Sequence, residues 1–209
     1  MPRLLNRVMG RSSWPVLVLS FFALVGSGRG AGQQDIVGEP VAEGLEVFSI
    51  DGLYGYRDLK GKVVIPPQFE DARVFDGGLA PVKTGGKWGY IDKTVKFVIE
   101  ARFERYGLFR EGLAAVTIKG LMGYIDKTGK MVIRPQFLSA RRFSEGLAAV
   151  EMDGKWGYIN KTGVMVLEPQ FKFALDFSGG KAHVRLEDRG AIIDKTGKIV
   201  TLFKKRQHH

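Results

Sequence analysis

Short apolar runs separated by glycine-containing turns make up most of this chain. Within residues 146–171 the apolar runs are Leu147–Val150, Trp156–Ile159 and Val164–Leu167. Runs of this length, bounded by Gly or Pro, predict strands that are joined by tight turns. No window that is free of Gly and Pro and long enough for a helix shows the 3.6-residue apolar period. We therefore expect each such segment to form a three-stranded antiparallel meander.

The same unit recurs along the chain with one fixed period. The residues that open the second turn of each unit show this period most clearly: Asp58, Asp92, Asp126, Asn160 and Asp194. A fixed period of this kind indicates a repeat protein, in which each unit buries its apolar side against the next. We expect an all-β tandem repeat of about five 34-residue meanders over residues 44–203. An elongated, solenoid-like array is the first expectation, and a closed, propeller-like array is the alternative.

Two local features sharpen the prediction of a β repeat. In Asp126–Lys130 (DKTGK), the aspartate suits the first position of a type I turn, and the glycine suits the left-handed position that closes the hairpin. Val95 replaces that glycine in an earlier copy, so we expect a strained or differently closed turn there. Gly157 lies between two aromatic residues of a predicted strand, which indicates close approach of a neighbouring backbone.

The repeated motifs resemble those of the WG-repeat (KWG-repeat) family of bacterial proteins. The resemblance rests on Glu145–Val150 (EGLAAV), Gly154–Ile159 (GKWGYI), Glu168–Phe171 (EPQF) and Gly86–Asp92 (GKWGYID). It extends over residues 44–203. It implies a β-rich binding or scaffold module and does not imply any particular reaction.

The copies depart from the motif mainly at its tryptophan. Trp88 and Trp156 hold this position in two copies, whereas Tyr54, Met122 and Gly190 hold it in the others. Divergent first and last copies are what the capping of a repeat array requires.

The N-terminal segment predicts export. Three arginines precede an apolar stretch at 14–25, and small residues follow it, which is the layout of a secretory signal peptide over residues 1–31. The stretch is shorter than the roughly 20 residues of a membrane span. Residues 32–43 are interpreted as a linker and residues 204–209 as a basic tail. We expect a periplasmic or secreted bacterial protein, with membrane contact only if the signal stays uncleaved as an anchor.

Composition excludes several kinds of chemistry. The chain has no Cys, so thiolate catalysis and cysteine-based metal sites are excluded. The formal charge is +10, and without the four arginines of the leader it is 28 basic against 22 acidic residues, or +6. This modest and dispersed charge does not predict nucleic-acid binding. The aspartate column is interpreted as turn structure rather than as a calcium site, and we expect no catalytic residue, cofactor or metal.

Two columns of residues are candidate binding sites. Stacked units would align the turn lysines on one edge as an anion-binding stripe: Lys93, Lys127, Lys161 and Lys195. Aromatic residues of the second strand are a candidate platform for a sugar or a peptide: Trp88, Trp156, Tyr90, Tyr124 and Tyr158. The simpler alternatives are solvated lysines at turn tips and aromatic rings in the core.

These features predict an exported, non-catalytic binding or scaffold module for another macromolecule of the cell envelope. The expected partner is a protein or an anionic envelope glycan. One alternative is a cell-envelope glycan hydrolase, which would need two facing acids in a cleft. The other is a purely structural envelope component, which would have no ligand that stabilises the fold.

Overall fold

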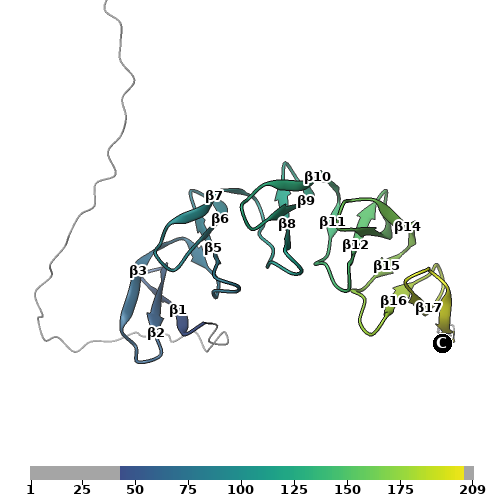
Figure 1. Cartoon of the computed structure of the whole chain (residues 1–209), viewed down its shortest axis with the longest axis horizontal. Coiled ribbons are helices and arrows are strands. Elements are labelled where there is room, and N and C mark those ends of the chain that lie inside the picture. The colour runs from purple at the N-terminus through teal and green to yellow at the C-terminus, as the bar shows by residue number, and fades with distance from the viewer. Residues whose placement is uncertain (1–42, 205–209) are drawn as a thin grey trace, which may run out of the picture. The chain divides into compact units, whose positions relative to one another are not determined.

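The computed structural model describes residues 43–204, and its regular structure is all β. Five antiparallel sheets follow one another in chain order (Figure 1). The predicted signal peptide, the predicted linker apart from its last residue, and residues 205–209 of the predicted tail lie outside the described residues. Within residues 43–204 there is no helix with the length and hydropathy that crossing a bilayer requires.

Each sheet belongs to one unit of the sequence repeat, numbered here from 1 to 5. Unit 1 (43–70) contains β1 (Leu45–Ile50), β2 (Leu53–Asp58) and β3 (Val63–Phe69). Unit 2 (71–104) contains β4 (Asp71–Ala72), β5 (Ala80–Thr84), β6 (Lys87–Ile91) and β7 (Phe97–Phe103). Unit 3 (105–138) contains β8 (Leu113–Ile118), β9 (Leu121–Asp126) and β10 (Met131–Phe137). Unit 4 (139–172) contains β11 (Ser139–Ala140), β12 (Leu147–Met152), β13 (Lys155–Asn160) and β14 (Met165–Phe171). Unit 5 (173–204) contains β15 (Phe173–Ala174), β16 (Lys181–Arg185), β17 (Gly190–Asp194) and β18 (Ile199–Leu202).

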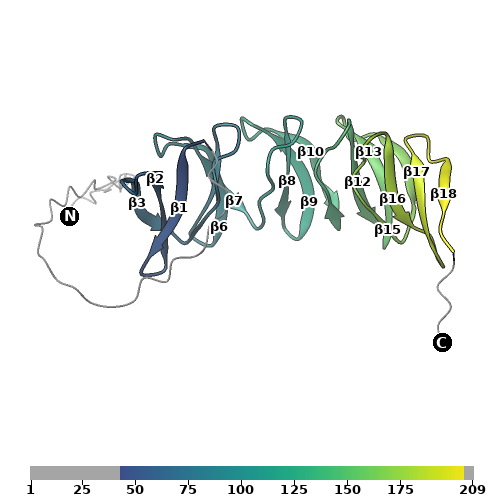
Figure 2. The ribbon, with the colours of Figure 1, turned by 90° about the horizontal axis from the view of Figure 1, so that it is seen from below.

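The predicted meander is present in every unit, and a short fourth strand extends three of them. The three long strands of each unit pair in chain order, as β16, β17 and β18 do in Figure 2. The strands β4, β11 and β15 pair with the other edge of the first long strand. This fourth strand is a difference from the predicted three-stranded unit. In unit 3 only an isolated bridge between Arg105 and Thr117 stands in its place.

The glycine of the WG motif is required by the approach of the third strand. A Cβ built on Gly89 would lie 2.6 Å from the carbonyl oxygen of Ile99, and one on Gly157 would lie 2.5 Å from that of Leu167. Both contacts are with backbone, which cannot rotate away. The predicted close approach is thus confirmed.

The turn between the second and third strands has the predicted geometry. The Oδ1 atom of Asp126 accepts hydrogen bonds from the backbone N–H groups of Thr128 and Lys130, at 2.9 and 3.1 Å. Gly129 then takes a φ of 84°. Val95 takes a φ of 68° in the same turn of unit 2, so the turn keeps its shape and the valine carries the strain that the sequence predicted.

The core lies between consecutive sheets. Each of four buried clusters combines one face of a sheet with the facing side of the next unit, as Tyr56 and Phe69 of unit 1 do with Phe75 and Val82 of unit 2. Among residues 43–204 no core cluster joins unit 1 to unit 5. Stacking of near-identical units along the chain therefore buries the apolar faces, as the repeat predicted.

The outer faces of units 1 and 5 carry polar residues at positions that are apolar in unit 4. Where unit 4 has Ala148 and Ile159 on the face toward the preceding unit, unit 1 has Glu46 and Arg57, which form an ion pair at 3.1 Å. In unit 5, polar residues occupy positions that are apolar in unit 4 and face the next unit there: Lys181, His183 and Thr201. These are the capping changes that the divergent end copies indicated.

Candidate functional site

The tyrosines of the predicted aromatic platform are buried in the core. Tyr90, Tyr124 and Tyr158 are at most 1% exposed, and each donates a hydrogen bond from its hydroxyl to a backbone carbonyl of the following unit, at 2.7–2.8 Å. Tyr56 does the same in unit 1. Burial raises the pKa of all four hydroxyls. Each tyrosine therefore links its unit to the next by a hydrogen bond, and its buried ring cannot contact a ligand.

The two tryptophans are also buried by contacts within the protein. Trp88 and Trp156 are each 7% exposed. The Arg73 guanidinium lies 5.3 Å from the Trp88 ring, and Tyr106 packs on the same ring at 4.2 Å. The structure thus places the whole proposed platform in the core rather than on a surface open to a sugar or a peptide.

A similar stack occurs two units further on, with the arginine and tryptophan at equivalent positions and the third ring one residue earlier in the repeat. The Arg141 guanidinium lies 5.4 Å from the Trp156 ring and 4.9 Å from the ring of Phe173. An arginine, a tryptophan and an aromatic residue of the following unit therefore close both the boundary between units 2 and 3 and that between units 4 and 5.

The four lysines of the predicted stripe (Lys93, Lys127, Lys161 and Lys195) each contact the preceding unit, and we call this series of contacts the ladder. Each lysine donates from Nζ to a backbone carbonyl of the preceding unit, at 2.9–3.2 Å. Three of the four also form ion pairs with a glutamate of the preceding unit, and these pairs are Lys93–Glu43, Lys161–Glu111 and Lys195–Glu145. Three positive charges of the stripe are thus balanced within the protein.

The glutamates of this ladder have strained backbones. Glu43, Glu111 and Glu145 have φ values of 52–60°, a region that favours glycine. The N–H of Gly78 and the Lys93 ammonium hold the pKa of Glu43 below its usual value, and Gly180 and Lys195 do so for Glu145. Sequence reasoning missed these pairs, because each joins residues of two different units.

Lys127 is the exception in the ladder. The position of the partner glutamate is held by Gly77, and Lys127 donates only to the carbonyl of that glycine, at 3.0 Å. Of the four predicted anion-binding lysines, Lys127 is therefore the one without a carboxylate partner among residues 43–204. An anion-binding role for the stripe stays a prediction, and this lysine is where it applies best.

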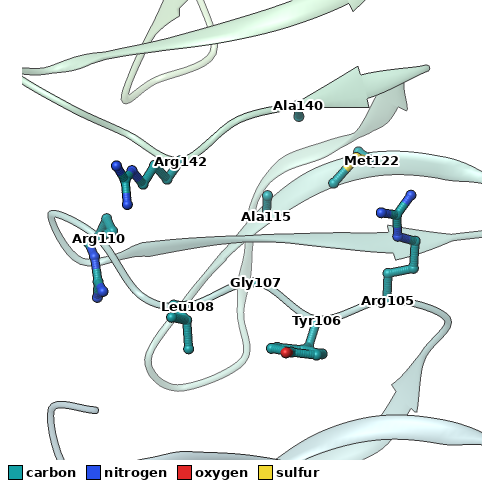
Figure 3. Close-up of a pocket in the computed structure, with 9 residues that line it drawn as sticks. All are labelled: Arg105, Tyr106, Gly107, Leu108, Arg110, Ala115, Met122, Ala140 and Arg142. Atoms are coloured by element: carbon teal, nitrogen blue, oxygen red, sulfur yellow. The ribbon is translucent and has the colours of Figure 1, made fainter. Parts of the chain in front are cut away.

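A pocket of about 330 Å³ opens at the boundary between units 3 and 4 (Figure 3). Its apolar lining comes from Leu108, Ala115, Met122 and Ala140. Three arginines of the same lining stand around these residues: Arg105, Arg110 and Arg142. Figure 3 shows Arg110 and Arg142 at one end of the pocket and Arg105 at the other, beside Met122. Sequence reasoning missed this pocket, although it had noted Met122 in the tryptophan column.

A column of exposed valines runs along the last strand of every sheet. Its members occupy the same position in each unit and are 39–47% exposed: Val64, Val98, Val132, Val166 and Val200. Val98 lies between Phe97, which pairs with Ile91, and Ile99, which pairs with Tyr90, so it is the unpaired residue of a β-bulge. The same register shift occurs in the other four sheets.

The aspartate column forms turn structure, as the sequence indicated. The Oδ1 atoms of Asp92, Asp126 and Asp194 each accept a hydrogen bond from the hydroxyl of the threonine in the same turn, at 2.6 Å. Among residues 43–204 no group of three or more His, Asp or Glu side chains has the arrangement of a metal site. His183 stacks on Phe203 at 6.1 Å between ring centres, on the capping face of unit 5.

Comparison with known proteins gives a family and a fold. A family model described as "WG containing repeat" matches residues 54–88, 88–121, 122–156 and 156–189. Comparison with curated protein sequences gives no match.

Several solved structures have a similar arrangement of strands. Hsv2 of Kluyveromyces lactis, with its loop 6CD replaced by a Gly-Ser linker, is similar at a TM-score of 0.51 and 10% identity, over 79% of this chain and 64% of that chain. A eukaryotic initiation factor is similar at a TM-score of 0.53 and 12% identity, over 77% of this chain and 51% of that chain. The chain thus spans between half and two thirds of the length of these structures, and at such identities the likeness shows the fold alone.

Proposed function

Since this chain belongs to the family of WG-containing repeat proteins, we propose that it is an exported, non-catalytic module that binds another protein of the cell envelope through a repeated surface. The observation that carries this proposal is the column of bulged valines. Five equivalent apolar side chains, each 39–47% exposed, recur on the last strand of every sheet. Because the same residue is exposed once in every unit, a partner can make many weak contacts along the array, and their binding energies add.

The bulge supports contact through side chains rather than through backbone pairing. The last strand of each sheet has a free edge, and an added strand from a partner would pair with it if the edge were regular. A bulge interrupts that edge and turns the unpaired valine outward. A partner would therefore meet the valines themselves.

A protein partner fits this surface better than an anionic glycan does. Valine side chains offer apolar contact, which favours the apolar side chains of a protein. Of the four lysines that would attract an anionic glycan, three are neutralised by glutamates of the ladder. The glycan remains the alternative, with Lys127 as its best contact.

The exported location and the lack of catalysis belong to the same proposal. Export is supported by the basic, apolar and small-residue segments of residues 1–31. The buried tyrosines, the aspartates of the turns and the glutamates of the ladder all have a structural use in holding units together or closing turns. A periplasmic or secreted location and a non-catalytic role are therefore the function that we propose.

Photo-crosslinking from the valine column tests this proposal. The full chain is expressed in a bacterium with p-benzoylphenylalanine in place of Val98, Val132 or Val166, one position at a time, and irradiated in intact cells. Crosslinks to the same envelope protein are expected from all three positions. Leu138 is the matched control, because it is an apolar residue of unit 3 that is 58% exposed and lies outside the column.

A second variant separates binding from folding. Replacing the three valines by threonine keeps the β-branched shape and removes apolar surface, so the fold is expected to persist while the crosslinked partner is lost. Equal crosslinking from Leu138, or recovery of the chain only on glycan, would contradict a protein partner at this surface. A chain that stays in the cytoplasm would contradict export.

A further inference from the structure

We propose that the pocket between units 3 and 4 is a binding site for an aromatic carboxylate. The inference does not depend on the valine column or on the location of the protein. It rests on the residues that the repeat places at this boundary, on their charge, and on the way the two neighbouring boundaries fill the same place.

The pocket lies where two other boundaries hold an arginine stacked on a tryptophan. Between units 2 and 3 the stack consists of Arg73, Trp88 and Tyr106. One repeat later the equivalent positions all line the pocket, and they hold Gly107, Met122 and Ala140. Each is smaller than its counterpart, so the stack of an arginine on aromatic rings is missing at this boundary, although Tyr106 also lines the pocket.

The backbone has also adapted to the smaller residues. A Cβ on Gly107 would lie 2.4 Å from the carbonyl oxygen of Ala115, so the chain comes closer there than any side-chain-bearing residue allows. The short strand that units 2, 4 and 5 form at this point is absent from unit 3, where one isolated bridge from Arg105 remains. The open pocket is therefore built into the backbone of unit 3 and is more than the loss of one side chain.

The charge of the lining selects an anion. Three of the lining residues are arginines (Arg105, Arg110 and Arg142) and none is acidic, and the charge of Arg105 is the one that no aspartate or glutamate among residues 43–204 balances. Arg110 pairs with Asp76 of unit 2, and Arg142 pairs with Asp176 at 2.8 Å, so these two are held in place from outside the pocket. Arg105 has no ion pair among residues 43–204, and its guanidinium is available to a ligand.

The apolar part of the lining selects a ring. Leu108, Ala115 and Met122 form a surface on which a flat ring can pack, and arginine stacks well on aromatic faces. At both neighbouring boundaries the protein itself packs an arginine against an aromatic ring. A ring with an attached carboxylate meets both requirements, and 330 Å³ lies at the small end of ligand pockets, which are roughly 300–1,000 Å³.

Titration of the full chain with indole-3-propionate tests the proposal. Its indole resembles the missing tryptophan, and its carboxylate can reach an arginine. We expect saturable binding that shifts the NMR signal of the Met122 methyl group. The neutral amide of the same compound is expected to bind about tenfold more weakly, as the loss of a charged hydrogen bond predicts.

Three variants locate the site. Arg105→Gln is expected to weaken binding by roughly three- to tenfold, because it removes the unpaired guanidinium. Arg134→Gln is the matched control, since it removes an exposed arginine of the same unit that does not line the pocket, and it is expected to change nothing. The double variant Met122→Trp/Ala140→Tyr restores the rings of the repeat and is expected to abolish binding.

Two peptides distinguish the sources of such a ligand. Gly-Gly-Trp with a free carboxylate represents the C-terminus of a polypeptide, and its amidated form lacks the charge. Binding of the free peptide as well as indole-3-propionate would assign the site to a protein C-terminus, and binding of the small acid alone would assign it to a free aromatic acid.

Several results would overturn the proposal. These are equal binding of acid and amide, binding that survives in Met122→Trp/Ala140→Tyr, and no saturation at millimolar indole-3-propionate. If the double variant fails to fold, Arg105→Gln against Arg134→Gln and the Met122 methyl signal still decide the question.

Discussion

Units 2 and 4 close their boundary with the next unit by stacking an arginine on a tryptophan, whereas unit 3 leaves the same place open. The stacks are Arg73 on Trp88 and Arg141 on Trp156, at equivalent positions of the two units. Between them, Met122 stands in the tryptophan column and borders a pocket. The three units nevertheless share the same long strands, turns and tyrosine hydrogen bonds.

The repeat therefore has two kinds of position. Tyrosine and glycine columns recur in all three middle units because each makes a backbone contact that no other residue type reproduces. The tryptophan and arginine columns make contacts through side chains, such as the hydrogen bond from Arg73 Nε to the Tyr106 hydroxyl, and these contacts vary from unit to unit without loss of the fold. Variable positions of this kind are where a repeat protein can acquire a site.

The largest effect is expected at the glycines that recur in every middle unit. Gly123→Ala and Gly157→Ala each place a Cβ at 2.5 Å from a backbone carbonyl oxygen of the third strand. Each is expected to lower the free energy of unfolding by about 2–3 kcal/mol, because strands must move apart. Urea unfolding measures both. A much smaller loss in unit 3 than in unit 4 would show that the two units differ in scaffold as well as in filling.

The reciprocal exchange at the tryptophan column should give unequal effects. Trp156→Met removes ring contacts with Phe173 and Arg141 and is expected to cost roughly 2 kcal/mol. Met122→Trp fills an open pocket and is expected to change stability by less than about 1 kcal/mol. Equal losses in the two variants would mean that Met122 is as closely packed as Trp156, contrary to the comparison above.

The sequence predicted the features that depend on residue type at a fixed local spacing. The period, the strands, the turn opened by Asp126 and the close approach at Gly157 all follow from local rules, and the structure has them. Contacts between units were harder to foresee. Lys161 and Glu111 are far apart in the sequence, and their pairing depends on how one unit sits on the next.

The short fourth strand and the valine bulges escaped prediction for a related reason. Strands such as Ser139–Ala140 have two residues and no apolar alternation, so nothing in their sequence marks them. Val132 reads as an ordinary strand residue until its neighbours' pairing shows that it has no partner. The pocket could not be predicted from the exchange of Trp for Met alone, because it also depends on Gly107 and Ala140, which are far apart in the sequence.

A smaller effect is expected at the strained turn of unit 2. Val95 has a φ of 68°, where the equivalent Gly61 of unit 1 has 81°. Val95→Gly relieves backbone strain but loses some packing on the core cluster between units 1 and 2. We therefore expect the free energy of unfolding to rise by about 0.5–1 kcal/mol. Gly61→Val is the matched control, because nothing lies within 4 Å of a Cβ there, and it should cost about 1 kcal/mol. A loss of stability in Val95→Gly would show that packing outweighs strain.

The smallest effect concerns acid, and unit 4 supplies its own comparison. The threonine hydroxyl and backbone N–H groups hold the pKa of Asp92, Asp126 and Asp194 below its usual value, while Asn160 accepts the same bonds without titrating. A lowered native pKa stabilises the fold above the unfolded value of about 3.9, and this contribution is lost as the pH falls through the native pKa. Replacing the three aspartates by asparagine should therefore make the free energy of unfolding less dependent on pH between about 5 and 2. Asn160→Asp should make the free energy of unfolding more dependent on pH over the same range. Urea unfolding of both variants at about pH 5 and about pH 2 measures the contrast. Unchanged pH dependence in both would mean that the turn carboxylates titrate alike in the folded and unfolded chains.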